Sequence, residues 1–404
     1  MTEPKISPVV HTEVCIVGGG PAGMVAGLLF ARAGVRTLVL EKHSDFLRDF
    51  RGDTVHPSTL NLFDELGLMD ALLDRPHDKV EDVEAVLAGR AYRIADFTHL
   101  PGRGKFIAMM PQWEFLDFVA QEARRYPAFA LRMETEGVEV IERGGRVTGV
   151  RTARGEEIAA NLVIAADGRG SKMRGGLPLR DLGAPIDVLW FGVPKRRTAE
   201  NQTQGYISGG EMIVAIDRGD YFQCARVIEK GSAPDILGRG LEAFRAEVEK
   251  VVVPVQGLMQ ALRSLDEVKL LSVTLDRLTR WSRPGLLAIG DAAHAMSPVG
   301  GVGINLAVQD AVAAANILAG PMALGRDPDP LISRVQARRE FPVRVIQAMQ
   351  RTAHRTVIRA ALAGTVQNAP LIVRLLDRTP LLQRIPARVL GLGVRREHIR
   401  SPKA

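Results

Sequence analysis

The order of elements in residues 13–44, EVCIVGGGPAGMVAGLLFARAGVRTLVLEKHS, constrains the fold more than any other part of this chain. The apolar run 14–17 has the length of a buried parallel strand. A glycine turn and an apolar helical stretch follow, and Gly34 is placed to end that helix. Residues 35–40 form a second apolar run. This order predicts a strand–helix–strand unit, from which α/β domains with a parallel sheet are built.

Three glycines and one acid give this unit its chemical meaning. Gly18 allows a tight turn after the first strand, Gly20 lets a pyrophosphate lie on the backbone, and Gly23 lets the helix pack against the strand. Glu41 ends the second strand, 23 residues after Gly18, where its carboxylate can accept the ribose hydroxyls of an adenine nucleotide. The pattern predicts a dinucleotide site and excludes NADP there, but leaves NAD and FAD open.

The segments downstream do not continue the regular alternation of a typical NAD domain. Short β-rich runs follow, with hairpin turns at Gly144-Gly145 and near residues 154–155. They predict a three-stranded meander whose last strand includes residues 162–166. A late apolar strand, GLLAIGD, ends at Asp291. We therefore expect one domain that is assembled from distant segments.

A loop with almost no large side chains stands at residues 290–305, GDAAHAMSPVGGVGIN. It is rich in glycine and has one acid and no lysine or arginine. Such backbone can approach a ligand closely, and a helix that begins near Ile304 presents unpaired N–H groups to negative charge. We expect a seat for a large, flat, partly anionic cofactor, with Asp291 accepting sugar-like hydroxyls. A plain turn with Asp291 as a helix N-cap is the alternative.

These motifs, in this order, resemble those of the class A flavin monooxygenases, the single-component aromatic hydroxylases related to para-hydroxybenzoate hydroxylase. GGGPAG with Glu41 resembles the FAD motif of that family. DGRGSKMR, residues 167–174, resembles its Asp-Gly motif, which serves FAD and the incoming NADPH. The 290–305 loop resembles its Gly-Asp motif, whose acid binds the FAD ribityl chain and whose loop lies along the isoalloxazine ring. The resemblance covers nearly the whole chain and favours FAD over NAD.

The resemblance also implies roles for single residues. Arg51 would reach the FAD phosphates and the flavin region, and Gln112 the ribityl chain. The expected cofactor-binding residues are Gly18, Gly20, Gly23, Glu41, Lys42, Arg51, Gln112, Asp167, Gly168, Asp291, Pro298, Gly301, Gly303, Ile304 and Asn305. No catalytic side chain is assigned beyond the flavin-side loop with Pro298 and Gly300. Arg169 and Arg174 would meet NADPH or pair with surface acids, and both interpretations stay open. No metal site is expected, because His and Cys do not cluster at ligand spacing.

The expected fold is α/β, with a Rossmann-like FAD-binding domain assembled from distant segments, an inserted antiparallel-sheet substrate domain, and C-terminal helices. The expected FAD-binding segments are 1–75, 100–178 and 270–330, the substrate segments are 76–99 and 179–269, and the basic helical segment is 331–404. In the strand YFQCARVI, alternation puts Gln223 on one face and Cys224 on the other. The sequence leaves open which face meets the substrate. Trp190, Tyr206 and Gln223 are the residues expected to contact it.

The activity that the resemblance implies is that of an FAD-dependent monooxygenase consuming NADPH or NADH. It would hydroxylate an aromatic or related electron-rich substrate with O₂ through a flavin hydroperoxide. A phenol, a polyketide-like aromatic, a heteroaromatic and a quinone precursor are all open as substrates. The alternatives are a flavoprotein reductase or dehydrogenase of the same fold and a non-catalytic flavin-binding protein. A flavin-dependent halogenase is disfavoured because the three tryptophans are isolated.

The charge of the chain is concentrated at one end. The formal net charge is +7, of which residues 331–404 carry +12 and the preceding residues −5. No groove-reading motif accompanies the basic residues, so nucleic acid is not an expected partner. Arginines recur four residues apart in this predicted helical tail, in the sets 351, 355 and 359, then 374 and 378, then 384 and 388. Such like-charged pairs weaken an isolated helix by about 0.2–0.5 kcal/mol each. The acidic remainder of the chain is the simplest partner for them, and a homodimer or an anionic membrane surface are the alternatives.

The location expected from the sequence is cytoplasmic. The first residues lack the basic-then-apolar plan of a secretory signal, and no uninterrupted apolar run approaches the length of a membrane span. Only Cys15 and Cys224 are present, too few for a disulfide framework. The length of the chain further suggests that no extra C-terminal domain follows.

Overall fold

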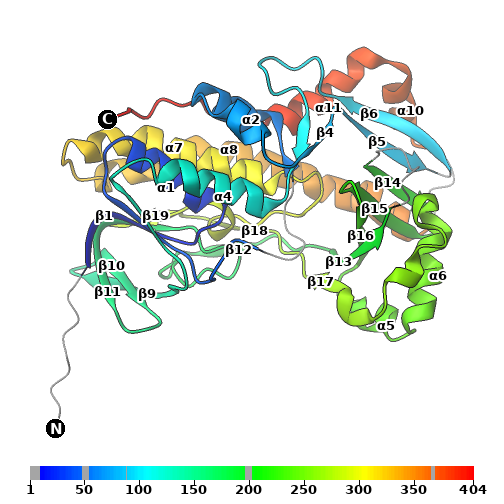
Figure 1. The fold of residues 1–404 in the computed structure, drawn as a ribbon, viewed down its shortest axis with the longest axis horizontal. Coiled ribbons are helices and arrows are strands. Elements are labelled where there is room, and N and C mark those ends of the chain that lie inside the picture. Colours follow the sequence, from blue (N-terminus) through cyan, green and yellow to red (C-terminus); the bar gives the residue numbers. More distant parts are fainter. Residues whose placement is uncertain (1–9, 48–53, 88, 196–202, 365–368) are drawn as a thin grey trace, which may run out of the picture.

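Two sheets dominate the chain, whose computed structural model describes residues 10–47, 54–87, 89–195, 203–364 and 369–404 (Figure 1). The larger sheet has the order β19 (Ser282–Arg283), β20 (Leu286–Ala288), β11 (Glu157–Ala165), β1 (Val10–Val17), β2 (Thr37–Leu40) and β8 (Phe129–Arg132), and β11 also pairs with β10 (Arg146–Thr152), which pairs with β9 (Gly137–Arg143). β1 is parallel to β2 and to β11, and β11 is parallel to β20. Strands from distant parts of the sequence thus form one sheet, as predicted.

The predicted meander is β9, β10 and β11, which run antiparallel to one another. Its first turn has Gly144 and Gly145 with φ of +57° and +77°, and its second has Gly155 with φ of +82°. Positive φ at both central residues is the geometry that a tight hairpin needs and that glycine adopts without strain. The glycines in the sequence therefore placed both turns correctly.

Helices pack on one face of the larger sheet and contribute to its hydrophobic core. The helices of this part are α1 (Pro21–Arg32), α2 (Pro57–Glu65), α3 (Met69–Leu73), α4 (Gln112–Ala123) and α7 (Gly303–Ala323). In Figure 1, α1, α4 and α7 lie together on one side of the sheet. Among the described residues, α7 alone is long and apolar enough to cross a membrane, but 72% of its most apolar stretch is buried inside the protein. Packing in the core therefore accounts for the composition of α7.

The second sheet has seven strands in the order β17 (Lys269–Leu271), β13 (Ile186–Pro194), β16 (Tyr221–Glu229), β15 (Glu211–Asp217), β14 (Gln204–Ser208), β5 (Asp82–Leu87) and β6 (Arg90–Asp96). All neighbours are antiparallel except β14 and β5, which are parallel. α5 (Ala233–Leu237) and α6 (Leu241–Val251) lie on one face of this sheet (Figure 1). Short elements complete this part of the fold: β3 (Thr54–Val55), β4 (Asp78–Val80), β7 (Ile107–Met109), β12 (Leu179–Asp181), β18 (Asp276–Leu278), and the 3₁₀ turns Val253–Val255, Met259–Ala261, Leu265–Glu267 and Gly290–Ala292.

The C-terminal segment is helical, as predicted. It consists of α8 (Asp329–Ala353), a π-helical turn (His354–Ile358), α9 (Arg359–Leu362), α10 (Leu371–Arg378) and α11 (Pro380–Leu392). α8 packs against α7, whereas α10 and α11 lie on β6 at the edge of the second sheet. The chain then returns to α1, where the backbone N–H of Ala404 donates to the carbonyl of Arg32 at 2.9 Å. The described parts of the tail therefore pack on the protein at α8, at α10 and α11, and at the last residue.

The strands of the second sheet come from segments 82–96 and 186–229 and from β17, which crosses the boundary expected at residue 270. β5 pairs with β14, and β6 pairs with β5, so a segment near residue 90 joins strands more than 100 residues later. We keep the division into FAD-binding and substrate segments as a proposal.

Candidate cofactor and substrate site

The glycine turn between β1 and α1 leaves one face of its backbone open. Gly18 has φ of +108°, and a Cβ built on it would lie 2.3 Å from the carbonyl oxygen of Ala166. A Cβ on Gly23 would lie 1.9 Å from the carbonyl oxygen of Gly18, so α1 packs directly on the turn. A Cβ on Gly20, in contrast, would meet no atom within 4 Å. The three glycines thus have the three different environments that the sequence pattern predicts.

Glu41 closes on this turn from the end of β2. Its carboxylate accepts a hydrogen bond from the backbone N–H of Gly19 at 2.9 Å and another from the N–H of His43 at 3.1 Å. The Glu41 side chain is buried, whereas Lys42 beside it is exposed. The acid is therefore held at the edge of the turn, beside the backbone where a pyrophosphate would lie. Arg51, which the resemblance places at the FAD phosphates, lies outside the described residues.

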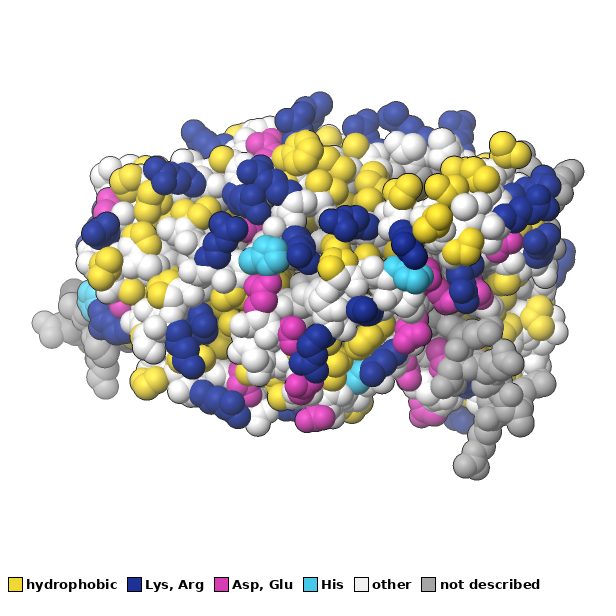
Figure 2. Space-filling model, turned by 90° about the horizontal axis from the view of Figure 1, so that it is seen from above, with side chains coloured by type: hydrophobic (Ala, Val, Ile, Leu, Met, Phe, Trp, Pro, Cys, Tyr) yellow, Lys and Arg dark blue, Asp and Glu magenta, His cyan; other side chains and the backbone are white. Residues whose placement is uncertain are grey.

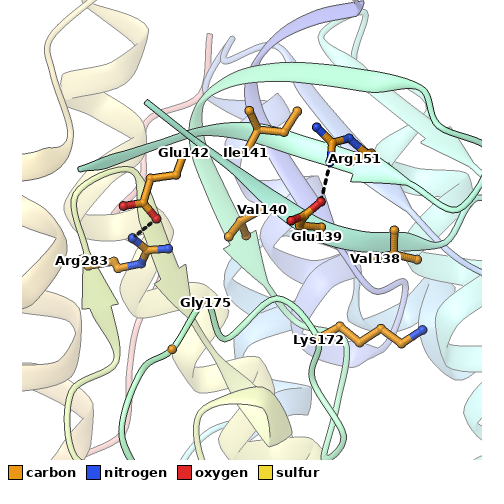
Figure 3. A pocket seen from close by; sticks show the side chains of 10 residues that line it. Val138, Glu139, Val140, Ile141, Glu142, Arg151, Lys172, Gly175 and Arg283 are labelled. Carbon is orange, nitrogen blue, oxygen red and sulfur yellow. Dashed lines mark hydrogen bonds and ion pairs between the residues drawn. The ribbon is translucent and has the colours of Figure 1, made fainter. Parts of the chain in front are cut away.

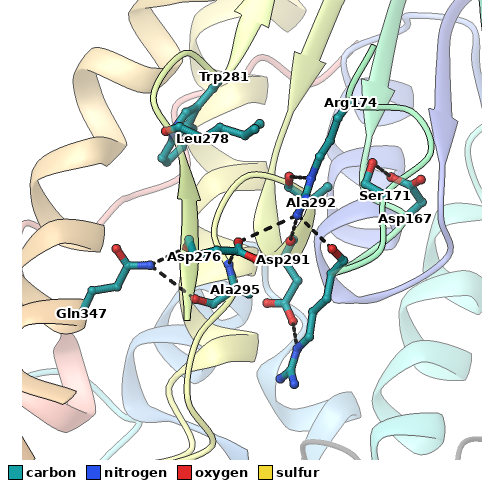
Figure 4. A network of polar contacts seen from close by, with 11 residues as sticks. Asp167, Ser171, Arg174, Asp276, Leu278, Trp281, Asp291, Ala292, Ala295 and Gln347 are labelled. Carbon is teal, nitrogen blue, oxygen red and sulfur yellow. Dashed lines mark hydrogen bonds and ion pairs between the residues drawn. The ribbon is translucent and has the colours of Figure 1, made fainter. Parts of the chain in front are cut away.

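Asp167 and Gly168 form a self-contained loop after β11. The Asp167 carboxylate accepts a hydrogen bond from the Ser171 hydroxyl (Figure 4). It also accepts hydrogen bonds from the backbone N–H groups of Lys172 and Met173. Gly168 has φ of +85°, which lets the chain turn sharply there. In this structure the Asp-Gly motif therefore stabilises its own loop.

Two arginines connect that loop to the Gly-Asp motif, as Figure 4 shows. Arg169 Nε donates to the Asp291 carboxylate at 3.0 Å, and about one third of each side chain is exposed. Arg174 donates to the carbonyl oxygens of Ala292 and of Arg169, each at 2.9 Å. It also lies 3.8 Å from the Asp276 carboxylate, whose pKa is raised above its ordinary value by burial. Pairing within the protein thus accounts for both arginines, and a role toward NADPH stays a proposal.

The flavin-side loop, residues 298–303, turns back on itself before α7. The Gly301 N–H donates to the Pro298 carbonyl at 2.9 Å, and Gly300 and Gly301 have φ of +82° and +62°. The Thr54 hydroxyl donates to the Gly301 carbonyl at 2.8 Å. Gly303 begins α7, and the N-cap of that helix makes no side-chain hydrogen bond to its first turn. The loop therefore ends in a helix N-terminus, followed by the partly buried Ile304, where negative charge is stabilised.

Asn305 joins this loop to the segment that leads into α2. Its side-chain oxygen accepts from the backbone N–H of His56 at 3.0 Å and from the Thr59 hydroxyl at 2.7 Å, and its NH₂ donates to the carbonyls of Thr54 and Gly301. A side chain with all these partners positions the loop. Gln112, at the start of α4, comes shortly after β7, which pairs with β3 at Thr54.

The ring of His56 links the segment that leads into α2 to the C-terminal helices. Its Nδ1 lies 2.8 Å from the Leu390 carbonyl of α11, and complete burial lowers the pKa of this histidine to about 4. The imidazole is therefore neutral near pH 7, and Nδ1 donates the proton of this hydrogen bond. Sequence reasoning gave His56 no role, because its partner lies 334 residues away.

A buried polar network, which the sequence analysis did not predict, contacts the Gly-Asp motif and stabilises it. Asp310 of α7 is fully buried and accepts from the Gly290 N–H at 3.1 Å, from His294 Nε2 at 2.6 Å and from Arg339 Nε of α8 at 2.9 Å. Burial by itself would raise the pKa of Asp310, but the charges and hydrogen bonds of His294 and Arg339 reverse this effect and hold it below its ordinary value. The ring of His294 also packs against that of Trp281. A lone acid inside the apolar run of α7 was the available signal.

The second sheet presents two different faces. Trp190 lies opposite Ala225 in the β13–β16 pair, and Gln223 points to the same side. Val299 of the flavin-side loop packs against the apolar cluster on this face. Tyr206 lies opposite Ile213 and packs on the other face, which α6 covers. The structure thus brings Trp190 and Gln223 to the side of the loop and separates Tyr206 from them.

One polar atom on the loop-facing side has no partner. The indole N–H of Trp190 is buried and makes no hydrogen bond within the described part of the chain. A buried donor without an acceptor costs about 1–3 kcal/mol. Such a donor is suited to an oxygen atom of a ligand.

A surface hollow of about 690 Å³ lies elsewhere, between the meander and the loop after Asp167 (Figure 3). None of the predicted cofactor residues lines it. Its cations are neutralised, because Arg283 pairs with Glu142 and Arg151 with Glu139, each at 2.6 Å. It offers no unpaired positive charge to a nucleotide phosphate and is not the candidate site.

Comparison with protein families agrees with this geometry. The family described as "FAD binding domain" matches residues 11–349, which include the glycine turn, the Asp-Gly loop and the Gly-Asp loop. The 6-methylpretetramide 4-monooxygenase of Streptomyces rimosus is 31% identical over 394 residues, 94% of this chain and 92% of that protein. The chain spans 60–65% of the length of several more distant relatives.

Solved structures show the same fold. PqsL of Pseudomonas aeruginosa, in complex with 2-aminobenzoylacetate, superposes with a TM-score of 0.76 at 21% identity and covers 91% of this chain and 100% of its own. OxyS anhydrotetracycline hydroxylase of Streptomyces rimosus gives 0.73 at 22% identity, with 95% of this chain and 76% of that one covered. At these identities the likeness concerns the arrangement of the chain.

Proposed function

Given that the chain belongs to the FAD binding domain family, we propose that its substrate is a fused-ring aromatic compound with a phenol or quinone oxygen. The chain is an FAD-dependent monooxygenase, like its 31% identical relative. That relative is named for a polycyclic substrate, 6-methylpretetramide, which supports the proposed class. The observation that carries the proposal is the unpaired indole N–H of Trp190 on a largely apolar sheet face.

The residues present fit FAD. An added Cβ on Gly20 would enter open space, so the turn can receive a pyrophosphate on its backbone. Glu41 at its edge would accept ribose hydroxyls, and Asp291 would accept hydroxyls of the ribityl chain. The flavin-side loop and the N-terminus of α7 would face the ring, with Gln112, Lys42, Gly168 and Gly303 around the cofactor. These roles are part of the proposal.

FAD, when bound, supplies electrons from NAD(P)H and delivers one atom of O₂ to the substrate, while the other leaves as water. The protein holds and shields these partners. The uncapped N-terminus of α7 would stabilise negative charge on a reduced ring. The apolar cluster that includes Ala225 and Val227, with Val299 packed on it, would exclude water from the substrate.

An isotope experiment tests this function. A panel of naphthols and hydroxyanthraquinones is offered to the FAD-loaded protein with NADPH or NADH under ¹⁸O₂. The expected result is substrate-stimulated NAD(P)H oxidation and one ¹⁸O atom in the product. Oxidation of NAD(P)H that never places oxygen in any member of the panel would contradict the proposed substrate class.

The reductant and the location belong to the same proposal. Arg169 is the more accessible of the two arginines suggested for NADPH, since about a third of its side chain is exposed. A cytoplasmic location is supported by the two cysteines, which are both buried and unpaired.

Replacing Asp291 by alanine should weaken FAD binding by about 10- to 100-fold, the cost of one charge-assisted hydrogen bond. Fluorescence titration of the apoprotein with FAD measures this. Arg169→Ala is the matched control, because it breaks the same ion pair but leaves the carboxylate in place. Equal losses in both variants would mean that Asp291 acts only through Arg169.

Replacing Trp190 by phenylalanine should raise KM for the phenolic substrate about fivefold to tenfold, because an aromatic, though smaller, side chain remains and one hydrogen bond is lost. Tyr206→Phe is the control on the opposite face, and its KM should match the wild type. Steady-state NAD(P)H oxidation gives both values. If Tyr206→Phe changes KM and Trp190→Phe does not, the assignment of the two sheet faces is wrong.

A further inference from the structure

The outer sides of α10 and α11 expose large aliphatic side chains that do not pack inside the protein. In α10, Leu371, Ile372 and Leu375 are exposed, with Leu371 at 81%. In α11, Leu381 and Ile385 are exposed at 66% and 62%. Large aliphatic side chains on adjacent helices are rarely left in water as a group. We call these five residues, together with Arg374, Arg378, Arg384 and Arg388, the tail patch.

The arginines of the tail patch are also without partners. All four are exposed, and none forms an ion pair within the part of the chain that the structure describes. The acid on the same helices, Asp377, points inward and accepts from the Arg93 N–H at 3.1 Å and from Arg90 at 3.3 Å. The simplest expectation from the sequence is that the acidic remainder of the chain pairs with these arginines, and within the described residues this set forms no such pair.

Spacing places the two kinds of side chain on common faces. Leu381, Arg384, Ile385 and Arg388 occupy positions i, i+3, i+4 and i+7, which lie on one side of α11. The opposite side of α11 holds the buried Gln383, Ala387 and Gly391. Figure 2, seen from above, shows yellow and dark-blue side chains intermixed at the end of the molecule where α10 and α11 lie. The patch is thus a continuous basic and apolar surface.

We propose that the tail patch is a docking surface for an anionic lipid membrane. A bilayer supplies both partners at once, since arginines meet lipid phosphates while leucines and isoleucines enter the acyl boundary. A symmetric contact with a second copy would set the same arginines against each other. Nucleic acid would meet the arginines but leave the five aliphatic side chains exposed.

The position of the patch gives membrane docking a consequence for the enzyme. Both helices lie on β6, the edge strand of the second sheet, and α11 reaches His56 through the Leu390 carbonyl. Docking would hold the substrate sheet beside the bilayer, where apolar aromatic compounds concentrate. The docking itself does not rest on the proposed substrate.

Co-sedimentation of the full-length, FAD-loaded protein with vesicles tests the proposal. With equal parts of phosphatidylglycerol and phosphatidylcholine at low salt, most of the protein should pellet, and physiological salt should release a large part of it. Phosphatidylcholine alone should bind little. Protein that stays in the supernatant with anionic vesicles at low salt overturns the proposal.

Paired variants separate a specific patch from general positive charge. Arg374→Gln with Arg384→Gln should weaken binding about fivefold per arginine, and Leu371→Ser with Ile385→Ser should weaken it similarly. The matched controls are Arg124→Gln with Arg154→Gln and Val253→Ser with Leu270→Ser, all exposed and outside α10 and α11. Equal losses in patch and control variants overturn the proposal. The proposal is also overturned if light scattering shows that the wild-type protein is a dimer and that the double variant Leu371→Ser with Ile385→Ser is a monomer.

Discussion

A Gly20→Val variant is expected to fold as the wild-type chain does and to purify colourless, without FAD. The backbone at Gly20 is extended, with φ of −75° and ψ of −177°, which valine adopts readily. A Cβ there would meet no protein atom within 4 Å, which leaves room for a branched side chain, so we expect the fold not to change. The pyrophosphate of FAD is the group that valine would displace, and we expect affinity to fall on the order of a hundredfold or more. Flavin absorbance and thermal unfolding of the apoprotein measure the two effects.

Gly23→Ala provides the contrast for this prediction. A methyl group at Gly23 would lie 1.9 Å from the Gly18 carbonyl oxygen, so this variant should lose stability even without cofactor. Substitution at Gly20 should therefore change FAD binding alone, and substitution at Gly23 both properties. A Gly20→Val protein that keeps one FAD per chain would show that the pyrophosphate does not lie over this turn.

The largest loss of stability is expected from Asp310→Ala. The substitution leaves the Arg339 guanidinium, only 1% exposed, without its main buried partner, and removes the acceptor for His294 and for the Gly290 N–H. Removing one member of a buried ion pair costs about 3–5 kcal/mol. Denaturant unfolding should show this loss, and FAD binding should weaken as well, because Gly290 directly precedes Asp291.

The pH dependence of stability gives a second measurement on the same residue. His294 and Arg339 hold the pKa of the buried Asp310 below its ordinary value of 3.8. Because the folded-state pKa is lower than the unfolded one, this carboxylate contributes its full stabilisation above about pH 4 and loses it as pH falls through the folded-state value. Asp310→Asn should flatten this part of the acid unfolding profile. An unchanged acid profile in Asp310→Asn would mean that other carboxylates govern unfolding there.

The sequence by itself determined the parts of this protein that depend on neighbouring residues. The conformation of Gly18 at φ of +108° and the hairpin glycines Gly144 and Gly145 are local properties, because only glycine adopts them without strain. The burial of β1 and β2 follows from short apolar runs. The resemblance to flavin monooxygenases is confirmed by the family match, since its motifs are themselves such local patterns.

The tertiary structure alone decided which distant side chains meet. Asp310 and Arg339 are 29 residues apart and Arg169 and Asp291 are 122 apart, so no periodicity in the sequence connects them. Strand alternation separated Gln223 from Cys224 correctly, but only the packing of α6 showed which face is covered. Tyr206 lies on that covered face, away from Trp190, for the same reason.

The basic C-terminal segment shows most clearly what the sequence alone does not determine. Counting charges gave +12 for residues 331–404 and −5 for the rest, which suggested that the two parts neutralise each other. Net charge carries no direction, however, and a helix on a sheet edge turns one side inward and the other outward. In α11 the inward side holds Gln383, Ala387 and Gly391, so Arg384 and Arg388 point to solvent. Which side of a helix faces water is set by what the helix packs against, and only the folded chain contains that information.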